Sequence, residues 1–94
     1  MKIIDIKFVK ELKPHSMMST PTPIFHTVCD TGYETDLYFD TWYSPADNIR
    51  NIICKEFDYV FTSRTYIDNI NEIIDNVIDQ LIEHKCIPYT KNEL

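Results

Sequence analysis

The sequence contains almost no glycine: Gly32 is the single one among 94 residues. Loops that hold nucleotide phosphates need several glycines at fixed spacing, so enzymes with Rossmann or P-loop nucleotide sites are excluded. The chain is also shorter than a kinase, TIM-barrel or α/β-hydrolase domain. Because no catalytic motif remains, we expect a protein that is not an enzyme and that needs no cofactor.

Long apolar runs and paired cysteine motifs are also missing. No window reaches the length of a signal-peptide core or a membrane span, so we expect a cytoplasmic protein, in the host cytoplasm if the gene is viral. Cys29, Cys54 and Cys86 are far apart and lie beside apolar residues, which favours buried reduced thiols over a disulfide framework. A zinc site using these thiols with His26 and His84 is an alternative, but no C-x-x-C pair supports it.

The chain is acidic, with 9 Lys and Arg against 15 Asp and Glu and a net charge of −6. Its apolar content of 44%, with 13% aromatics, is normal for a folded protein, so we expect one small acidic domain over residues 1–94. An acidic surface repels nucleic acids and anionic membranes, which argues against direct binding to either. A basic protein is the expected partner. The high isoleucine and low alanine content is typical of AT-rich coding sequence, such as that of Firmicute genomes and their phages.

The N-terminal segment predicts a half-buried strand. Residues 2–9 alternate, so that Ile4, Ile6 and Phe8 share one side of an extended chain and charged residues occupy the other. Residues 13–23 contain three prolines and four hydroxyl residues, which cannot hold a regular helix. We therefore expect a loop after the first strand.

The next two segments predict a β-hairpin. Residues 24–29 and 33–43 are rich in β-branched and aromatic side chains. The segment Asp30–Gly32 between them has the residues that turns require. With the first strand, this hairpin completes a small antiparallel sheet of about three strands.

The second half of the chain predicts two helices. Ser44–Asp47 has a serine cap followed by proline at the first helical position, and isoleucines then recur at helical spacing. Residues 57–61 could end this helix or form a short strand, because they also alternate. Thr65–Asp68 fits a capping box and opens a helix that we expect to continue to about Lys85. Its apolar face contains Ile67, Ile70, Ile73, Ile74, Val77, Ile78, Leu81 and Ile82. The order β-β-β-α-α predicts an α+β fold, with a small antiparallel sheet packed by two C-terminal helices.

Acidic residues form two periodic rows. The first row follows the predicted last helix at steps of three and four residues and contains Asp68, Glu72, Asp75, Asp79 and Glu83. Viewed down the helix axis, these positions fall within an arc of roughly 80°, opposite the isoleucine face. No lysine at position i+4 offsets their negative charge. The second row lies on one face of the extended segment 33–43 and contains Glu34, Asp36 and Asp40, with Tyr38 and Trp42 among them. From Asp30 to Glu83 there are twelve acids and three basic residues, a charge of −9.

These rows suggest that the protein imitates the charge of a nucleic-acid backbone. Carboxylates about 5 to 7 Å apart form a sparser version of the phosphate row that lysines and arginines of DNA-binding proteins contact. The leading hypothesis is therefore a small acidic inhibitor or decoy, encoded by a phage, that blocks a basic nucleic-acid-binding host protein such as a nucleoid protein, nuclease or polymerase. Both acidic rows, with Tyr38 and Trp42 as aromatic anchors, would bind this partner.

Two other interpretations remain open. The protein could be a regulatory or assembly module that binds through an apolar surface, for example as a homodimer, because small chains often gain stability from burial against a partner. The acidic rows could also be an ordinary solvated surface that keeps a small protein soluble. Dependence of partner binding on salt would separate the first of these from nucleic-acid mimicry.

Overall fold

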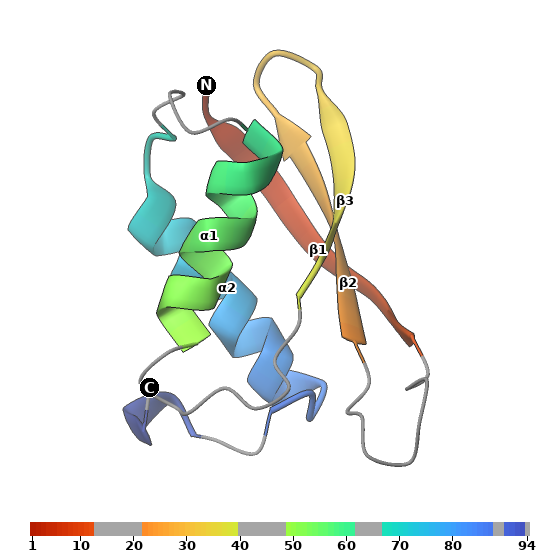
Figure 1. Ribbon diagram of the computed structural model, residues 1–94, viewed down its shortest axis with the longest axis vertical. Coiled ribbons are helices and arrows are strands. Elements are labelled where there is room, and N and C mark those ends of the chain that lie inside the picture. Colours follow the sequence, from red (N-terminus) through yellow and green to blue (C-terminus); the bar gives the residue numbers. More distant parts are fainter. Residues whose placement is uncertain (13–21, 40–48, 62–66, 88–89, 94) are drawn as a thin grey trace.

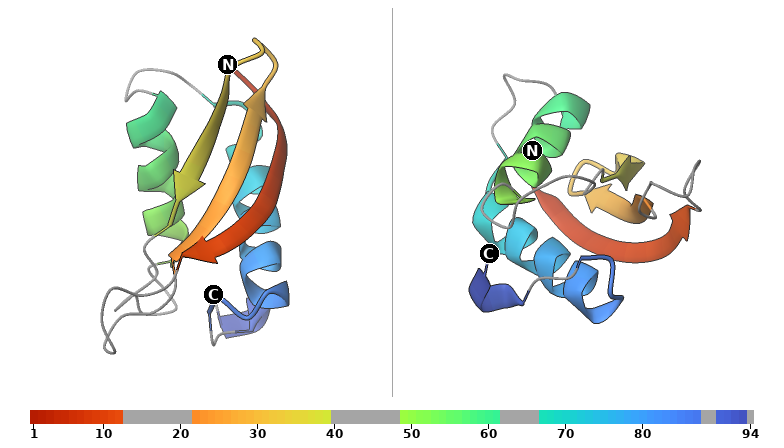
Figure 2. Two further views of the ribbon diagram at one scale, coloured as in Figure 1. Left: turned by 90° about the vertical axis from the view of Figure 1, so that its right-hand side faces the viewer. Right: turned by 60° about the horizontal axis from the view of Figure 1, so that its bottom comes forward.

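A computed structural model describes residues 1–12, 22–39, 49–61, 67–87 and 90–93. Its elements, in chain order, are β1 (Ile3–Leu12), β2 (Thr22–Cys29), β3 (Glu34–Tyr38), α1 (Ile49–Phe61), α2 (Ile70–Glu83) and the short 3-10 helix η2 (Lys91–Glu93). The strands form one antiparallel sheet in the order β1-β2-β3. Figure 1 shows both helices on the same face of this sheet, and the two views in Figure 2 agree. The predicted α+β fold with its β-β-β-α-α order is confirmed.

The hydrophobic core fills the space between the sheet and the two helices. Phe25 of β2 contacts Phe39 edge-to-face, with ring centroids 5.2 Å apart, and Phe39 contacts Phe57 of α1 at 6.2 Å. Phe57 and Phe61 are both buried one helical turn apart, so residues 57–61 belong to α1 and do not form a strand. In the described part of the chain, no helix is long and apolar enough to cross a membrane.

Strand β1 departs from simple alternation at two places. Its register with β2 shifts between Ile3 and Asp5 and again between Phe8 and Lys10, which indicates a β-bulge at each place. Ile4, at the first shift, is therefore 61% exposed, while Ile3 is buried. The prediction that Ile4 shares the buried face with Ile6 was wrong. The extra residue at the bulge interrupts the alternation of side chains between Ile3 and Ile6.

The hairpin is confirmed, but its bounds differ from the prediction. Hydrogen bonds at the turn include Cys29 N–H to the Tyr33 carbonyl at 2.8 Å. Strand β2 already begins at Thr22, so the end of the predicted loop belongs to the sheet. The predicted continuation of the hairpin over residues 40–43 and the predicted helix start at 44–47 lie outside the described residues.

Helix α2 begins two residues later than Asp68, the last residue of the predicted capping box. Asn69 precedes the first turn with a left-handed backbone (φ 53°) and makes no side-chain capping bond. Asp68 therefore lies before the helix, where it forms an isolated parallel bridge with Lys2. The predicted start was wrong, because this pairing with the N-terminal segment takes the place of a helical turn. Thr65 and Tyr66 of the predicted box lie outside the described residues.

A Schellman motif ends α2. The N–H of Cys86 donates to the Leu81 carbonyl and that of Lys85 to the Ile82 carbonyl, at 2.8 and 3.0 Å. Lys85 has the left-handed conformation (φ 58°) that this motif requires. The expected end near Lys85 is therefore close to the observed end at Glu83.

Candidate functional site

The acidic row of the last helix is a ridge of four carboxylates on α2. Glu72, Asp75, Asp79 and Glu83, which we call the acidic ridge, follow one another at steps of three and four residues. The buried side chains of α2 are Ile73, Ile74, Val77, Ile78 and Leu81. The ridge lies on the side of the helix away from these residues and spans about 16 Å of helix axis. Asp68 is exposed but lies outside the helix, so helical spacing no longer aligns it with the ridge.

Two of the ridge carboxylates have cationic partners. Arg50 Nη1 of α1 donates to Asp75 Oδ1 at 2.7 Å, and Lys91 Nζ lies 3.0 Å from Asp79 Oδ1. The hydrogen bond from Arg50 lowers the pKa of Asp75 below its usual value. The expectation of a ridge without counter-charge was wrong for these two residues, because both cations come from other elements. Asp75 and Asp79 side chains nevertheless remain 50% and 52% exposed.

The second acidic row surrounds a histidine. Glu34 and Asp36 of β3 lie 3.6 and 2.8 Å from the two ring nitrogens of His26 on β2. Hydrogen bonding to Asp36 is the largest cause of a raised His26 pKa. Leu37, between Asp36 and Tyr38, is buried in the core, so the acidic side chains of β3 face away from the helices.

The structure therefore separates the two predicted rows. Glu34, Asp36 and Tyr38 lie on the outer face of the sheet, whereas the acidic ridge lies on the outer side of the helical layer. Figure 2 shows that the helices occupy one side of the sheet, so a flat partner surface cannot contact both rows. Asp40 and Trp42, which were predicted to extend the β3 row, lie outside the described residues.

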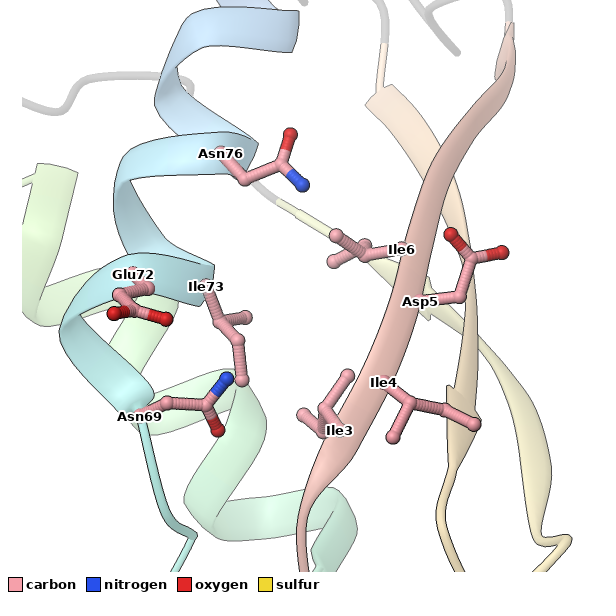
Figure 3. Close-up of a pocket in the computed structure, with 8 residues that line it drawn as sticks. All are labelled: Ile3, Ile4, Asp5, Ile6, Asn69, Glu72, Ile73 and Asn76. Carbon is pink, nitrogen blue, oxygen red and sulfur yellow. The ribbon is translucent and has the colours of Figure 1, made fainter.

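A small cavity lies between β1 and the first turns of α2. It has a volume of about 180 Å³. Figure 3 shows Ile3, Ile6 and Ile73 directed into this space, whereas Ile4 points away from α2. Its polar lining includes Asn69, whose buried Oδ1 has no hydrogen-bond partner within the described residues. Ligand pockets usually measure about 300 to 1,000 Å³, so this space is smaller than a typical small-molecule site.

Gln80 connects α2 to the free edge of β1. Its Oε1 accepts a hydrogen bond from Phe8 N–H at 2.6 Å, and its Nε2 donates to the Ile6 carbonyl at 3.2 Å. The side-chain amide thus occupies the position of a neighbouring strand and covers part of an edge that could otherwise pair with another chain. Sequence reasoning missed this residue, since a single glutamine on a helix gives no signal of what it contacts.

The thiols and histidines of the described residues are not grouped as metal ligands. Within the described residues, no group of three or more His, Cys, Asp and Glu side chains is placed to hold a metal ion. Cys29 is buried in the core and His26 faces outward from the same strand, so the two cannot share a ligand. Burial and a hydrogen bond to Glu11 raise the pKa of Cys86 to about 12, which keeps its thiol protonated at neutral pH. Cys54 is exposed and Cys86 is only partly buried, so the expectation of three buried thiols holds for Cys29 alone.

No protein-family model, no curated protein and no solved structure matches this chain. A function must therefore be inferred from the residues described above. Among these, the acidic ridge of α2 gathers the most charge on one regular element. It also retains four of the five residues of the acidic row that the sequence predicted for this helix.

Proposed function

We propose that the protein is a small acidic inhibitor whose α2 ridge binds a basic protein that normally binds nucleic acid. The observation that carries this proposal is the placement of four carboxylates on the exposed side of a helix whose opposite side is buried. A helix fixed by its core contacts holds the carboxylates at set distances before a partner arrives, so little ordering is required on binding. Lysine and arginine side chains that bind phosphates also bind carboxylates well.

The internal ion pairs leave the ridge able to bind further cations. Arg50 contacts one oxygen of Asp75, and a carboxylate can accept several hydrogen bonds. Glu72 and Glu83 are exposed and make no ion pair within the described residues. We therefore assign the primary contacts to Glu72 and Glu83, with Asp75 and Asp79 between them. The acids of β3 are not part of this contact.

The proposal places the protein in the cytoplasm of a bacterial host, as the product of a phage gene. The free thiols of Cys29, Cys54 and Cys86 support a reducing compartment. A basic partner such as a nucleoid protein, nuclease or polymerase would be bound there in competition with nucleic acid. Electrostatic capture of this kind predicts fast association that weakens strongly with salt.

Elution by nucleic acid tests this function. Immobilised protein is exposed to a bacterial lysate at low salt and then washed with double-stranded DNA. Mimicry predicts that captured proteins are released by DNA and by high salt, because both compete for the same basic surface. The double variant Glu72→Lys with Glu83→Lys should lose this capture.

The matched control carries two charge reversals on other surfaces. Glu34→Lys with Asp58→Lys changes the net charge by the same amount, but the first residue lies on the outer sheet face and the second on α1. This control should capture the same proteins as the unmodified chain. Equal capture by the ridge variant, or capture that DNA does not reverse, would show that the ridge is an ordinary solvated surface.

A further inference from the structure

No other described element covers the face of the sheet opposite the helices (Figures 1 and 2), although Ile24 of β2, level with Lys10 and Tyr38 on this face, is only 4% exposed. It carries an ordered distribution of charge. Lys7 and Lys10 lie on β1, Glu34 and Asp36 lie on β3, and His26 lies between them on β2. One edge of this face is therefore mainly basic, with two lysines and Asp5 on β1, and the other edge is acidic.

We propose that this outer sheet face is the contact surface of a homodimer, with its two-fold axis parallel to β2. Because β2 is the central strand, a half-turn about such an axis places β1 of one copy over β3 of the other. The basic edge of each copy then faces the acidic edge of its partner. Aligned packing of two sheet faces is a common arrangement, and a two-fold axis forms each favourable contact twice. This inference is independent of the ridge on α2.

The strand register identifies which side chains meet. Lys7, His26 and Asp36 form one row across the sheet, because Lys7 pairs with His26 and His26 with Asp36. A half-turn about an axis parallel to the strands keeps each residue at the same height along the strands. Lys7 of each copy therefore lies over Asp36 of the other. Asp36 binds His26 through Oδ1 alone, which leaves Oδ2 for the lysine. Lys7 makes no ion pair within the described part of its own chain, so it is available for this contact.

The neighbouring rows add one favourable and one unfavourable contact. Lys10 is level with Tyr38, a residue that is 51% exposed, so the lysine of one copy lies over the tyrosine of the other. Asp5 is level with Glu34, which brings two carboxylates together. Three strands make a face only about 15 Å wide. The dimer is therefore expected to be weak and dependent on concentration.

The first bulge of β1 increases the apolar area available at this contact. The first bulge turns Ile4 outward beside Asp5, on the side of the strand away from α2 (Figure 3). Simple alternation would have buried this side chain instead. An exposed isoleucine beside the charged rows supplies hydrophobic contact that ion pairs alone would lack. The first bulge thus supports a use of this face beyond solubility.

Sedimentation of charge-swapped variants tests the dimer. The unmodified protein should change from monomer to dimer between about 10 µM and about 1 mM. Lys7→Glu and Asp36→Lys should each weaken self-association at least about tenfold, since each places like charges together twice. An equimolar mixture of the two variants should dimerise again. In the mixed dimer, the carboxylate introduced at position 7 of one chain faces the ammonium introduced at position 36 of the other, and the native pair of Lys7 with Asp36 forms at the second site.

Matched controls use the exposed charges of α1, which lie away from the outer sheet face. Lys55→Glu and Asp58→Lys make the same charge changes and should leave the dimer unchanged. Asp5→Asn should tighten it, because one of the two opposing carboxylates is lost. A monomer throughout this concentration range, or a mixture of the Lys7 and Asp36 variants that stays monomeric, would overturn the proposal. None of these substitutions lies on the acidic ridge, so the dimer can fail while the proposed function stands.

Discussion

Thr27 is a polar residue at the centre of the inner sheet face. Its side chain is fully buried, and its hydroxyl has no hydrogen-bond partner within the described residues. A buried hydroxyl without a partner loses its hydration and costs about 1 to 3 kcal/mol. Threonine and valine have nearly the same shape, so the surrounding packing can be kept when the hydroxyl is removed.

We predict that Thr27→Val stabilises the protein by about 1 kcal/mol. Urea unfolding measures this change as a higher midpoint with an unchanged slope. Thr35→Val on the neighbouring strand is the control, because Thr35 is only partly buried and should respond less. A loss of stability in the Thr27 variant would mean that its hydroxyl does have a partner.

His26 makes the stability of the sheet depend on pH. The hydrogen bond to Asp36 is the main cause that raises the pKa of His26 above 6.5, the value expected for the unfolded chain. The folded state therefore binds the proton more tightly than the unfolded state. The resulting stabilisation is fully present below pH 6.5 and is lost as the pH rises through the higher folded pKa. Lys7 of β1 is the residue paired with His26 on the other side of β2.

The difference between the unmodified protein and His26→Gln isolates this effect. We predict that the free energy of unfolding of the unmodified protein falls relative to this variant as the pH rises above 6.5. Nuclear magnetic resonance titration of His26 should give a pKa above that value, and Asp36→Asn should bring it down. A pH-independent difference between the two proteins would contradict this role of the histidine.

At the scale of elements, Gln80 of α2 hydrogen-bonds backbone groups on the edge of β1 that is not paired with β2. Replacing Gln80 by methionine keeps the approximate shape and removes both hydrogen bonds to the strand. The partly buried N–H of Phe8 then has no acceptor, which should cost about 1 to 3 kcal/mol. Hydrogen exchange at Phe8 should accelerate more than exchange at Thr27, which lies on the central strand.

Asn71→Met serves as the control for Gln80, because Asn71 is an exposed position of the same helix. Its effect should stay within about 0.5 kcal/mol. If both substitutions change stability equally and leave exchange at Phe8 unaltered, Gln80 does not protect the edge of β1.

The elements that could be predicted from the sequence are those specified by local patterns. Isoleucine spacing placed α2 correctly over most of its length, and the Asp30–Gly32 turn placed the hairpin. Interactions between distant segments gave no such signal. Arg50 and Asp75 are 25 residues apart, so only the packing of α1 on α2 brings them together. The bulge at Ile4 likewise depends on pairing with β2, which alternation within one strand cannot reveal.

The candidate site was predictable in part for the same reason. Helical spacing correctly aligned the four acids of the ridge, because they lie within one regular element. The same spacing wrongly included Asp68, because Asn69 leaves the helical conformation and α2 begins after it. Whether the two acidic rows share a surface depends on how the layers pack, and the packing places them on different faces.

For the whole molecule, the uneven charge should make stability depend on salt. The net charge is −6, and the segment from Asp30 to Glu83 carries −9. Ion pairs such as Arg50 with Asp75 are exposed and contribute little, while repulsion among the remaining acids opposes the compact state. Added salt screens both effects, but the repulsive contribution is the larger at this net charge.

We predict that the free energy of unfolding rises between about 0.02 M and about 0.5 M NaCl, as the Debye length falls below the spacing of the acids. Urea unfolding at several salt concentrations measures this dependence. The variant Glu72→Lys with Glu83→Lys reverses two charges, which reduces the net charge from −6 to −2, and should show a smaller rise. It should also be more stable at low salt, because the change at residue 83 replaces a repulsive pair with an attractive one one turn from Asp79. A stability that falls with salt would mean that the internal ion pairs outweigh the repulsion, and the ridge would then be less available to a basic partner than we propose.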